Sequence, residues 1–260
     1  MIWKGFVRGL IYLVLLLIAC PSWAAHPLIT DDTGTQRKGK FQLELNGQYD
    51  WDRDDSEGVF VKSTGGQAAA TLSYGVADNV DLILNLPYLW GNTEVNETTV
   101  YDEKGIGDAT FEVKWRLFEK NGFSVALKPG ISIPTGNDEK GLGAGQLGGH
   151  LFLIASEEVG SWAFHGNLGY IRNENKVDER KDLWHASFAA TWEVVKNLKL
   201  AADIGIARNP DGDAKDDPAF LIGGIIFSVN ENFDVDFGAK CGLTKSETDF
   251  SLLAGVTFRF

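Results

Sequence analysis

The chain has 260 residues and a formal net charge of −12, from 36 acidic and 24 basic residues. An acidic balance of this size argues against nucleic acid as a partner, because phosphate is met by basic surfaces. It also leaves the compartment open, which the first residues address.

Residues 1–24 are typical of a secretory signal peptide. Lys4 and Arg8 are basic, and the run Leu10–Ala19 is apolar but short for a transmembrane helix. Ser22–Ala24 has the small-x-small form of a cleavage site, so we expect cleavage after residue 24. The mature chain then has 260 − 24 = 236 residues and a charge of −12 − 2 = −14, since two cations are lost.

An alternative at the N-terminus is a lipoprotein signal. Leu17–Cys20 resembles a lipobox, which would leave Cys20 lipidated at the mature N-terminus. With ordinary cleavage only Cys241 is retained, and no intramolecular disulfide can then form.

Beyond residue 40 the sequence alternates between apolar and polar residues with a period of two. The clearest segments are Phe41–Trp51, Val80–Trp90, Ala109–Phe118 and Phe250–Phe260, and the weakest is Thr64–Gly75. Such alternation predicts strands with one apolar and one polar face. We count twelve.

Short and long connections alternate between these strands. The tight ones are Val76–Asn79, Glu119–Gly122, Glu157–Gly160, Val195–Asn197 and Asn230–Asn232. The longer, acidic ones are Asp52–Ser63, Gly91–Ile106, Pro134–Gln146, Asn173–Asp182 and Asn209–Pro218, followed by the short Thr244–Asp249. This pattern predicts an all-β fold, a transmembrane antiparallel up-and-down β-barrel in the outer membrane with both termini periplasmic.

Aromatic residues favour a membrane barrel over a soluble sandwich. One set lies beside the long loops (Trp51, Trp90, Tyr170, Trp184), and another lies beside the tight turns or the C-terminus (Tyr74, Trp162, Trp192, Phe260). Two such belts are expected at two membrane interfaces. The apolar strand faces should contact outer-membrane lipid and lipopolysaccharide, and the strand ending in Phe260 is the expected signal for the barrel-assembly machinery.

The organisation that follows is a signal peptide (1–24), an N-terminal segment (25–40) and a barrel (41–260). The N-terminal segment is too polar to cross lipid. It is either a periplasmic tail or a plug in the lumen, where Thr30, Asp31, Asp32 and Thr33 could meet polar walls.

Three stretches carry a resemblance to a known family. They are "HPLITDDTGTQRKGKFQLEL" (His26–Leu45), "GIGDATFEVKWRLF" (Gly105–Phe118) and "ALKPGISIPTGNDEKGLG" (Ala126–Gly143). They resemble an outer-membrane family named for the meta-pathway of phenol degradation. The resemblance implies a transporter, with some members associated with aromatic degradation, and it supplies no catalytic residues.

Charged residues on the inward strand faces gather toward the periplasmic half. They are Glu44, Asp81, Lys114, Arg116, Glu193, Lys199, Asp203, Asp234, Asp236 and Arg259. We expect Arg259 to neighbour Glu44 or Asp236, and Glu193 to neighbour Lys199. The hypothesis is a connected ring of charges that narrows this end and sets ion preference.

Three histidines, His150, His165 and His185, fall inward on successive strands. Antiparallel pairing offsets neighbours by roughly 10 Å, so hydrogen bonding in the lumen is favoured over a metal site. No cofactor or metal is expected, and His26 has no obvious partner.

Two motifs suggest other chemistry. His185-Ala186-Ser187 has the His-x-Ser spacing of outer-membrane phospholipases, but Phe188-Ala189 departs from that family, and parity places the pair in the lumen rather than toward lipid. The acidic loop Asn209–Asp217 lacks the Glu and the spacing of a calcium-binding loop. We therefore expect no enzyme, with a lipid hydrolase as the minor alternative.

Two function classes stay open. The first is a channel for passive uptake of small, hydrophobic or aromatic compounds. The second is a closed structural or interaction barrel with acidic extracellular loops. Twelve strands allow either, because they lie between filled eight-stranded barrels and open porins.

Overall fold

The structure, a computed structural model, describes residues 26–56 and 58–260, so the predicted signal peptide and Cys20 lie outside the described residues. The strands are β1 (Phe41–Ser56), β2 (Val59–Ala77), β3 (Val80–Val95), β4 (Thr98–Ile106), β5 (Ala109–Lys120), β6 (Phe123–Ile133), β7 (Gly148–Val159), β8 (Trp162–Arg172), β9 (Asp182–Val195), β10 (Leu198–Ala207), β11 (Ala219–Asn230), β12 (Phe233–Gly242) and β13 (Phe250–Arg259). A short 3-10 helix, η2, covers Asp138–Lys140. Among the described residues, no helix is long and apolar enough to cross a membrane.

The labelled strands occupy twelve positions around a barrel, because β4 and β5 share one partner. β3 pairs with β5 along Val80–Asn85 and with β4 along Tyr88–Val95. Gly107 and Asp108 separate β4 from β5. The predicted twelve-stranded antiparallel barrel is confirmed.

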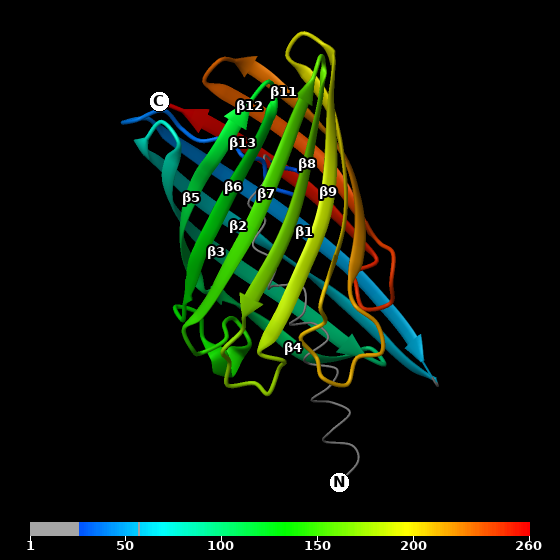
Figure 1. Ribbon diagram of the computed structural model, residues 1–260. Helices are drawn as coiled ribbons and strands as arrows, with labels where there is room; N and C mark the ends of the chain where they lie inside the picture. The colour runs from blue at the N-terminus through cyan, green and yellow to red at the C-terminus, as the bar shows by residue number, and fades with distance from the viewer. Residues whose placement is uncertain (1–25, 57) are drawn as a thin grey trace.

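The sheet closes on itself between its first and last strands (Figure 1). β1 pairs with β2 along one edge and with β13 along the other, with Leu43 opposite both Leu72 and Phe258. Apart from the β3–β4–β5 arrangement, each strand pairs with its neighbours in sequence, which is an up-and-down topology. Closure leaves no unpaired strand edge in lipid.

Burial alternates along the strands as the sequence pattern predicts. On β3, Leu84 and Leu86 are 38% and 48% exposed, whereas Ile83 and Asn85 between them are 5% and 8% exposed. An exposed apolar face on the outside of a closed barrel is the pattern that a transmembrane barrel requires.

Aromatic rings pack together at both ends of the barrel wall. The rings of Trp162 and Trp192 stack with centroids 5.3 Å apart beside the tight turns. At the other end, the ring of Trp51 lies 5.8 Å from that of Phe250. These positions match the two predicted belts.

The two ends of the barrel differ in their connections. The five connections predicted to be tight lie at the end where Phe41 and Phe260 exchange backbone hydrogen bonds of 2.8 and 3.0 Å (Figure 1). In one of them, Asn121 and Gly122 have φ values of 53° and 91°, as a type I′ hairpin turn requires. The long connections 134–147, 173–181 and 208–218 lie at the opposite end, together with the tips of the β1–β2 and β3–β4 hairpins.

Two predicted loops are wrong, because the chain stays in strands there. Asp52–Ser63 lies mostly in the β1–β2 hairpin, and Gly91–Ile106 forms the β3–β4 hairpin. Strand pairing continues past the apolar band through polar residues, with Lys62 opposite Glu94 and their charged atoms 3.7 Å apart. Polar cross-strand pairs therefore extend the wall beyond the membrane region.

The inside and outside of β3 should respond differently to charge. Leu84→Arg should lower the free energy of unfolding by about 2–4 kcal/mol, because it places a charge in lipid. Asn85→Arg should cost much less, because Asn85 lines open space in the lumen. Urea unfolding in lipid vesicles measures both, and equal losses would show that the assigned faces are wrong.

Candidate functional site in the barrel lumen

The described part of the N-terminal segment, residues 26–40, runs inside the barrel. Thr30, Asp31 and Thr33 are 1%, 2% and 4% exposed. The side chain of Asp32 keeps 38% of its surface open and faces a cavity. The four residues predicted for a plug therefore lie against the lumen wall, not in a free tail.

Asp203 on β10 binds the start of this segment. Its carboxylate accepts hydrogen bonds from the backbone N–H groups of Ile29 and Thr30, both at 2.7 Å, and from the Thr30 hydroxyl at 2.5 Å. Three donors on one buried carboxylate satisfy its charge and fix the path of the chain.

Asn167 on β8 and two serines bind the next residues. The Asn167 side chain accepts from Asp31 N and donates to Asp31 O, both at 2.8 Å. Thr33 N donates to Ser156 Oγ at 3.1 Å, and the Thr33 hydroxyl lies 2.5 Å from Ser124 Oγ. The segment is thus bonded to successive strands across the lumen.

Asp31 lies between two buried lysines. Its carboxylate oxygens accept from Lys114 Nζ at 2.8 Å and from Lys128 Nζ at 2.7 Å. The side chains of the three residues are at most 9% exposed. Removing one member of such a group leaves buried charge uncompensated and costs about 3–5 kcal/mol.

Small residues make room for the segment. A Cβ atom at Gly224 or Gly238 would lie 2.4 or 2.7 Å from the ring of Pro27, so only glycine permits this close approach. Leu28 packs nearby in a buried cluster with Ala189 and other apolar side chains.

The prediction that His26 has no partner is wrong. Its Nδ1 contacts the carboxylate of Asp236 on β12, and both side chains are buried. Further along, Gln36 N donates to both oxygens of Asp81, at 3.1 and 2.9 Å. His26 could not be paired from sequence, because its partner is 210 residues away.

The predicted charges do not pair with one another in a ring. Four of them, Asp81, Lys114, Asp203 and Asp236, bind the N-terminal segment instead. The alternation of the strands predicted that these side chains point inward. It did not predict that the N-terminal segment lies between them.

One of the two predicted pairings needs correction, and the other is confirmed by the strand register. Arg259 binds Asp234 at 2.6 Å, not Glu44 or Asp236, because the β12–β13 register places Asp234 nearest the barrel end. Glu193 does neighbour Lys199, because the two residues are directly opposite each other in register. Both are exposed, and a Glu193 oxygen accepts a hydrogen bond from Asn197 N in the turn. Arg116 pairs with Glu119 at 3.1 Å.

The three inward histidines each have a separate partner. His150 Nε2 lies 2.5 Å from Glu112 Oε1, His165 Nδ1 lies 2.9 Å from Ser156 Oγ, and His185 Nε2 lies 3.0 Å from Ser187 Oγ. Within residues 26–56 and 58–260, no group of three or more His, Cys, Asp or Glu side chains is placed to hold a metal ion.

The other two motifs have structural roles. His185 is buried in the lumen, where its ring meets Phe152 edge-on at 5.8 Å, so it does not face lipid. In the loop Asn209–Asp217, Asp217 accepts from Asn209 N at 2.9 Å and Asp211 accepts from Asp213 N at 2.8 Å. These carboxylates therefore stabilise the conformation of the loop in which they lie.

Three cavities lie in series along the lumen. The outer cavity, about 190 Å³, is lined by residues of β2, β3, β5–β9 and the loops 134–147 and 173–181. The inner cavity, about 370 Å³, is lined by the N-terminal segment and by strand residues of the tight-turn half. A middle cavity of about 30 Å³ shares Gln67 and Asn85 with the outer one and His26 with the inner one. It has room for about two waters.

Asp108 assembles the wall of the outer cavity. Its carboxylate accepts from Gly136 N at 2.9 Å and from Ala144 N at 2.8 Å, which folds the loop 134–147 against β5. Thr135 completes the joint, because its hydroxyl donates to Gly107 O at 2.7 Å and accepts from Ala109 N at 2.8 Å. This joint places Leu142 in the cavity.

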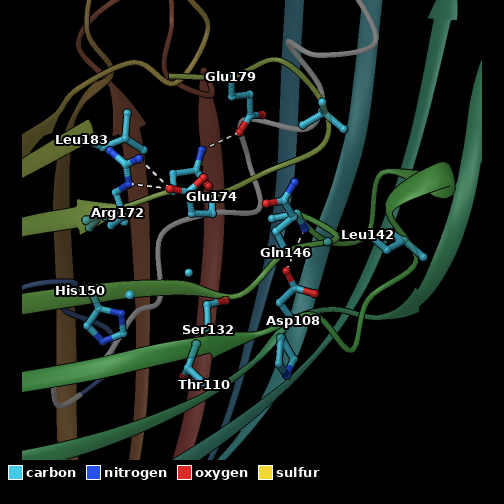
Figure 2. Close-up of a pocket in the computed structure, with 18 of the residues that line it drawn as sticks. Asp108, Thr110, Ser132, Leu142, Gln146, His150, Arg172, Glu174, Glu179 and Leu183 are labelled. Atoms are coloured by element: carbon cyan, nitrogen blue, oxygen red, sulfur yellow. Dashed lines mark hydrogen bonds and ion pairs between the residues drawn. The ribbon is translucent and has the colours of Figure 1, made fainter. Parts of the chain in front are cut away.

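Arg172, Glu174 and Glu179 lie on one side of the outer cavity, and Asp108 lies on the other side with neutral polar residues (Figure 2). Arg172 binds Glu174 at 2.6 Å, and hydrogen bonds from Lys181 and Arg172 hold the pKa of Glu174 below its usual value. Burial raises the pKa of Glu179 on the same side. His150, Thr110 and Ser132 lie opposite.

A line of polar contacts joins the outer cavity to the N-terminal segment. His150 lines the cavity and binds Glu112, whose other oxygen lies 3.7 Å from Lys128 Nζ. Lys128 in turn binds Asp31. The sequence analysis missed Lys128 and did not single out Glu112 as a site residue. The alternation along their strands places both side chains inward and was the signal that could have found them.

The closed wall, the two aromatic belts and the polar lumen define the class of outer-membrane β-barrels. Within that class, the chain belongs to the family described as "MetA-pathway of phenol degradation", whose model matches residues 59–260, or 202 of 260 residues. No protein of curated function matches the sequence.

Solved structures share the fold at low sequence identity. The chain is similar to the COG4313 outer membrane channel from Pseudomonas putida F1, with a TM-score of 0.67 and 17% identity over 88% of this chain and 98% of that one. It is also similar to the translocator domain of the autotransporter NalP from Neisseria meningitidis (0.56; 13%; 99% and 98%) and to the KdgM porin (0.55; 8%; 84% and 99%).

The Asp31 anchor should control how tightly the N-terminal segment is held. Asp31→Asn should speed hydrogen exchange at the Thr30 and Thr33 amides about a hundred- to a thousandfold, because a buried charge loses its partner. The matched control is Asp32→Asn, whose carboxylate is 3.9 Å from Lys114. NMR or mass spectrometry reads the rates, and equal rates in both variants would contradict the anchor.

Proposed function

We propose that the protein is an outer-membrane channel for passive entry of small solutes, with residues 26–40 as an internal plug. The observation that carries this proposal is the series of three cavities, which is narrowest beside His26. These cavities, which share lining residues, mark the proposed route of the solute, and His26 of the N-terminal segment lines the smallest of them.

The plug is held mainly by polar contacts, with apolar packing of Leu28 at its start. Asp203, Asn167 and Lys128 each hold it through hydrogen bonds that water can replace once the lumen is wet. Together these hydrogen bonds hold the segment firmly, but water can replace each of them singly. This supports a segment that stays docked at rest and leaves the path when its bonds are broken together.

The end with tight turns faces the periplasm in this proposal, and the long loops face the outside. Short periplasmic turns and long outer loops are the arrangement of bacterial barrels. The short-turn end also carries the paired termini of the barrel wall, Phe41 and Phe260. A solute therefore meets the outer cavity first.

Charge in the inner cavity supports a preference for cations. Six carboxylates line it (Asp31, Asp32, Glu44, Asp81, Asp234, Asp236), against two cationic side chains, Lys114 and Arg259. A water-filled constriction with excess negative charge concentrates cations. In place of the predicted ring, the inner cavity as a whole is proposed to set ion preference.

Single-channel recording in planar bilayers tests the proposal. The full chain should give small conductance steps, and deletion of residues 26–36 should enlarge them several-fold, because the narrow point is opened. A salt gradient should give a reversal potential on the cation side. If neither the full chain nor the deletion variant gives conductance steps, the channel is contradicted and a closed interaction barrel is favoured.

A further inference from the structure

The inner cavity carries more negative charge than its own cations compensate. Among the described residues, six carboxylates line it against two lysine or arginine side chains, and both of these are already bound. Lys114 contacts Asp31 at 2.8 Å, and Arg259 contacts Asp234 at 2.6 Å. Because buried charge without compensation is costly, the cavity favours a cation from outside the chain.

Glu44 on β1 is a carboxylate of this cavity without an ion pair. The residue is 8% exposed, and its side chain lines the cavity. The Gln42 side chain donates a hydrogen bond to it, but within residues 26–56 and 58–260 no Lys, Arg or His side chain lies within ion-pair distance of it. Since an ionised carboxylate has two oxygens that each accept hydrogen bonds, Glu44 keeps unused acceptor capacity.

Thr257 and Asp234 lie beside Glu44 on neighbouring strands. Thr257 on β13 is directly opposite Glu44 on β1 and directly opposite Asp234 on β12. All three residues line the cavity, and none is more than 9% exposed. Asp234 binds Arg259 through Oδ2, whereas its Oδ1 has no hydrogen-bond partner among the described residues. A row of carboxylate, hydroxyl and carboxylate therefore crosses three strands.

A primary ammonium group matches this row. It carries one positive charge and three N–H donors, one for each of the three acceptors. A metal ion is a poorer match, because in the part of the chain that the structure describes no group of three or more His, Cys, Asp or Glu side chains is placed to hold one. The hydroxyl at the centre of the row also favours a hydrogen-bond donor over a bare cation.

Apolar side chains in the same cavity favour an organic ammonium over an inorganic ion. Ile83 on β3 and Ile226 on β11 line the cavity, and they are 5% and 8% exposed. The cavity has a volume of about 370 Å³. Because an apolar cavity of about 150 Å³ holds benzene, an alkyl chain of several carbons fits beside the ammonium group.

We propose that the inner cavity binds the primary ammonium group of a small alkylamine between Glu44, Thr257 and Asp234. The alkyl chain lies against the two isoleucines. Arg259, at the tight-turn end of the cavity, has a side chain that is 37% exposed, so the amine enters from that end. This inference rests on the proposed cation preference of the inner cavity and names the cation that the cavity holds.

Fluorine NMR titration of the full chain in a zwitterionic detergent tests the site with three probes that share one tail. They are 4,4,4-trifluorobutylamine, 4,4,4-trifluorobutanol and 4,4,4-trifluorobutyrate. At neutral pH we expect saturable binding of the amine, and at least tenfold weaker binding of the alcohol and the acid. At matched ionic strength, methylammonium should displace the amine probe at least tenfold better than tetramethylammonium, which has the same charge and no N–H donor.

Two variants locate the ammonium group, and a third is the matched control. Glu44→Gln keeps the size of the side chain and removes its charge, so it should weaken amine binding about ten- to a hundredfold. Thr257→Val removes the hydroxyl and should weaken it about three- to tenfold. Glu193→Gln makes the same change at an exposed residue outside the cavity and should bind like the unaltered protein. Heat-modifiable migration on gels confirms that each variant is a folded barrel.

Four results would overturn the inference: equal binding of the amine and the alcohol, unchanged amine affinity in Glu44→Gln, equal displacement by methylammonium and tetramethylammonium, or displacement by Mg²⁺ at lower concentration than by methylammonium. If Glu44→Gln does not fold, unchanged affinity in Thr257→Val decides against the site. A cation-selective channel that does not bind the amine contradicts the site alone, whereas amine binding by a barrel that never conducts contradicts the channel alone.

Discussion

The arrangement of the lumen depends on one interaction, the carboxylate of Asp31 between Lys114 and Lys128. Two lysines pointing into one region of a barrel repel each other and need a counter-charge. A segment of the same chain supplies it, so the charges on the wall and the path of residues 26–40 are fixed together. The bonds from Asp203 and Asn167 then orient the backbone on either side of this point.

The stretches that resemble the family meet in the lumen. The first begins with the segment that crosses the lumen, and Asp108 of the second binds Gly136 of the third. None of these contacts is needed to close the wall, which strand pairing and the apolar face already achieve. The line from His150 through Glu112 and Lys128 to Asp31 places the outer cavity and the plug in one connected structure.

The wall could be predicted from sequence because its determinants are local. Period-two alternation along β3 and β13 and turn residues such as Asn121-Gly122 each act within a few positions. The contacts in the lumen could not be predicted from sequence, because the residues that bind each other are far apart in the chain. Asp31 and Lys114 are 83 residues apart, and His26 and Asp236 are 210 residues apart. Parity gave the inward direction of Asp203 and Asp236, but not that they bind the N-terminal segment. The β3–β4 hairpin was missed because its polar residues lack the alternation that marks a strand.

The central claim, that the docked segment closes the path, is tested most directly by a reversible lock. Thr33 and Ser124 have hydroxyls 2.5 Å apart, so Thr33→Cys with Ser124→Cys places two thiols within reach of a disulfide. In a background of Asp31→Asn and Cys241→Ser, the oxidised protein should show small conductance steps, and a reductant should enlarge them. Identical conductance before and after reduction, with the disulfide verified by mass, would contradict the account.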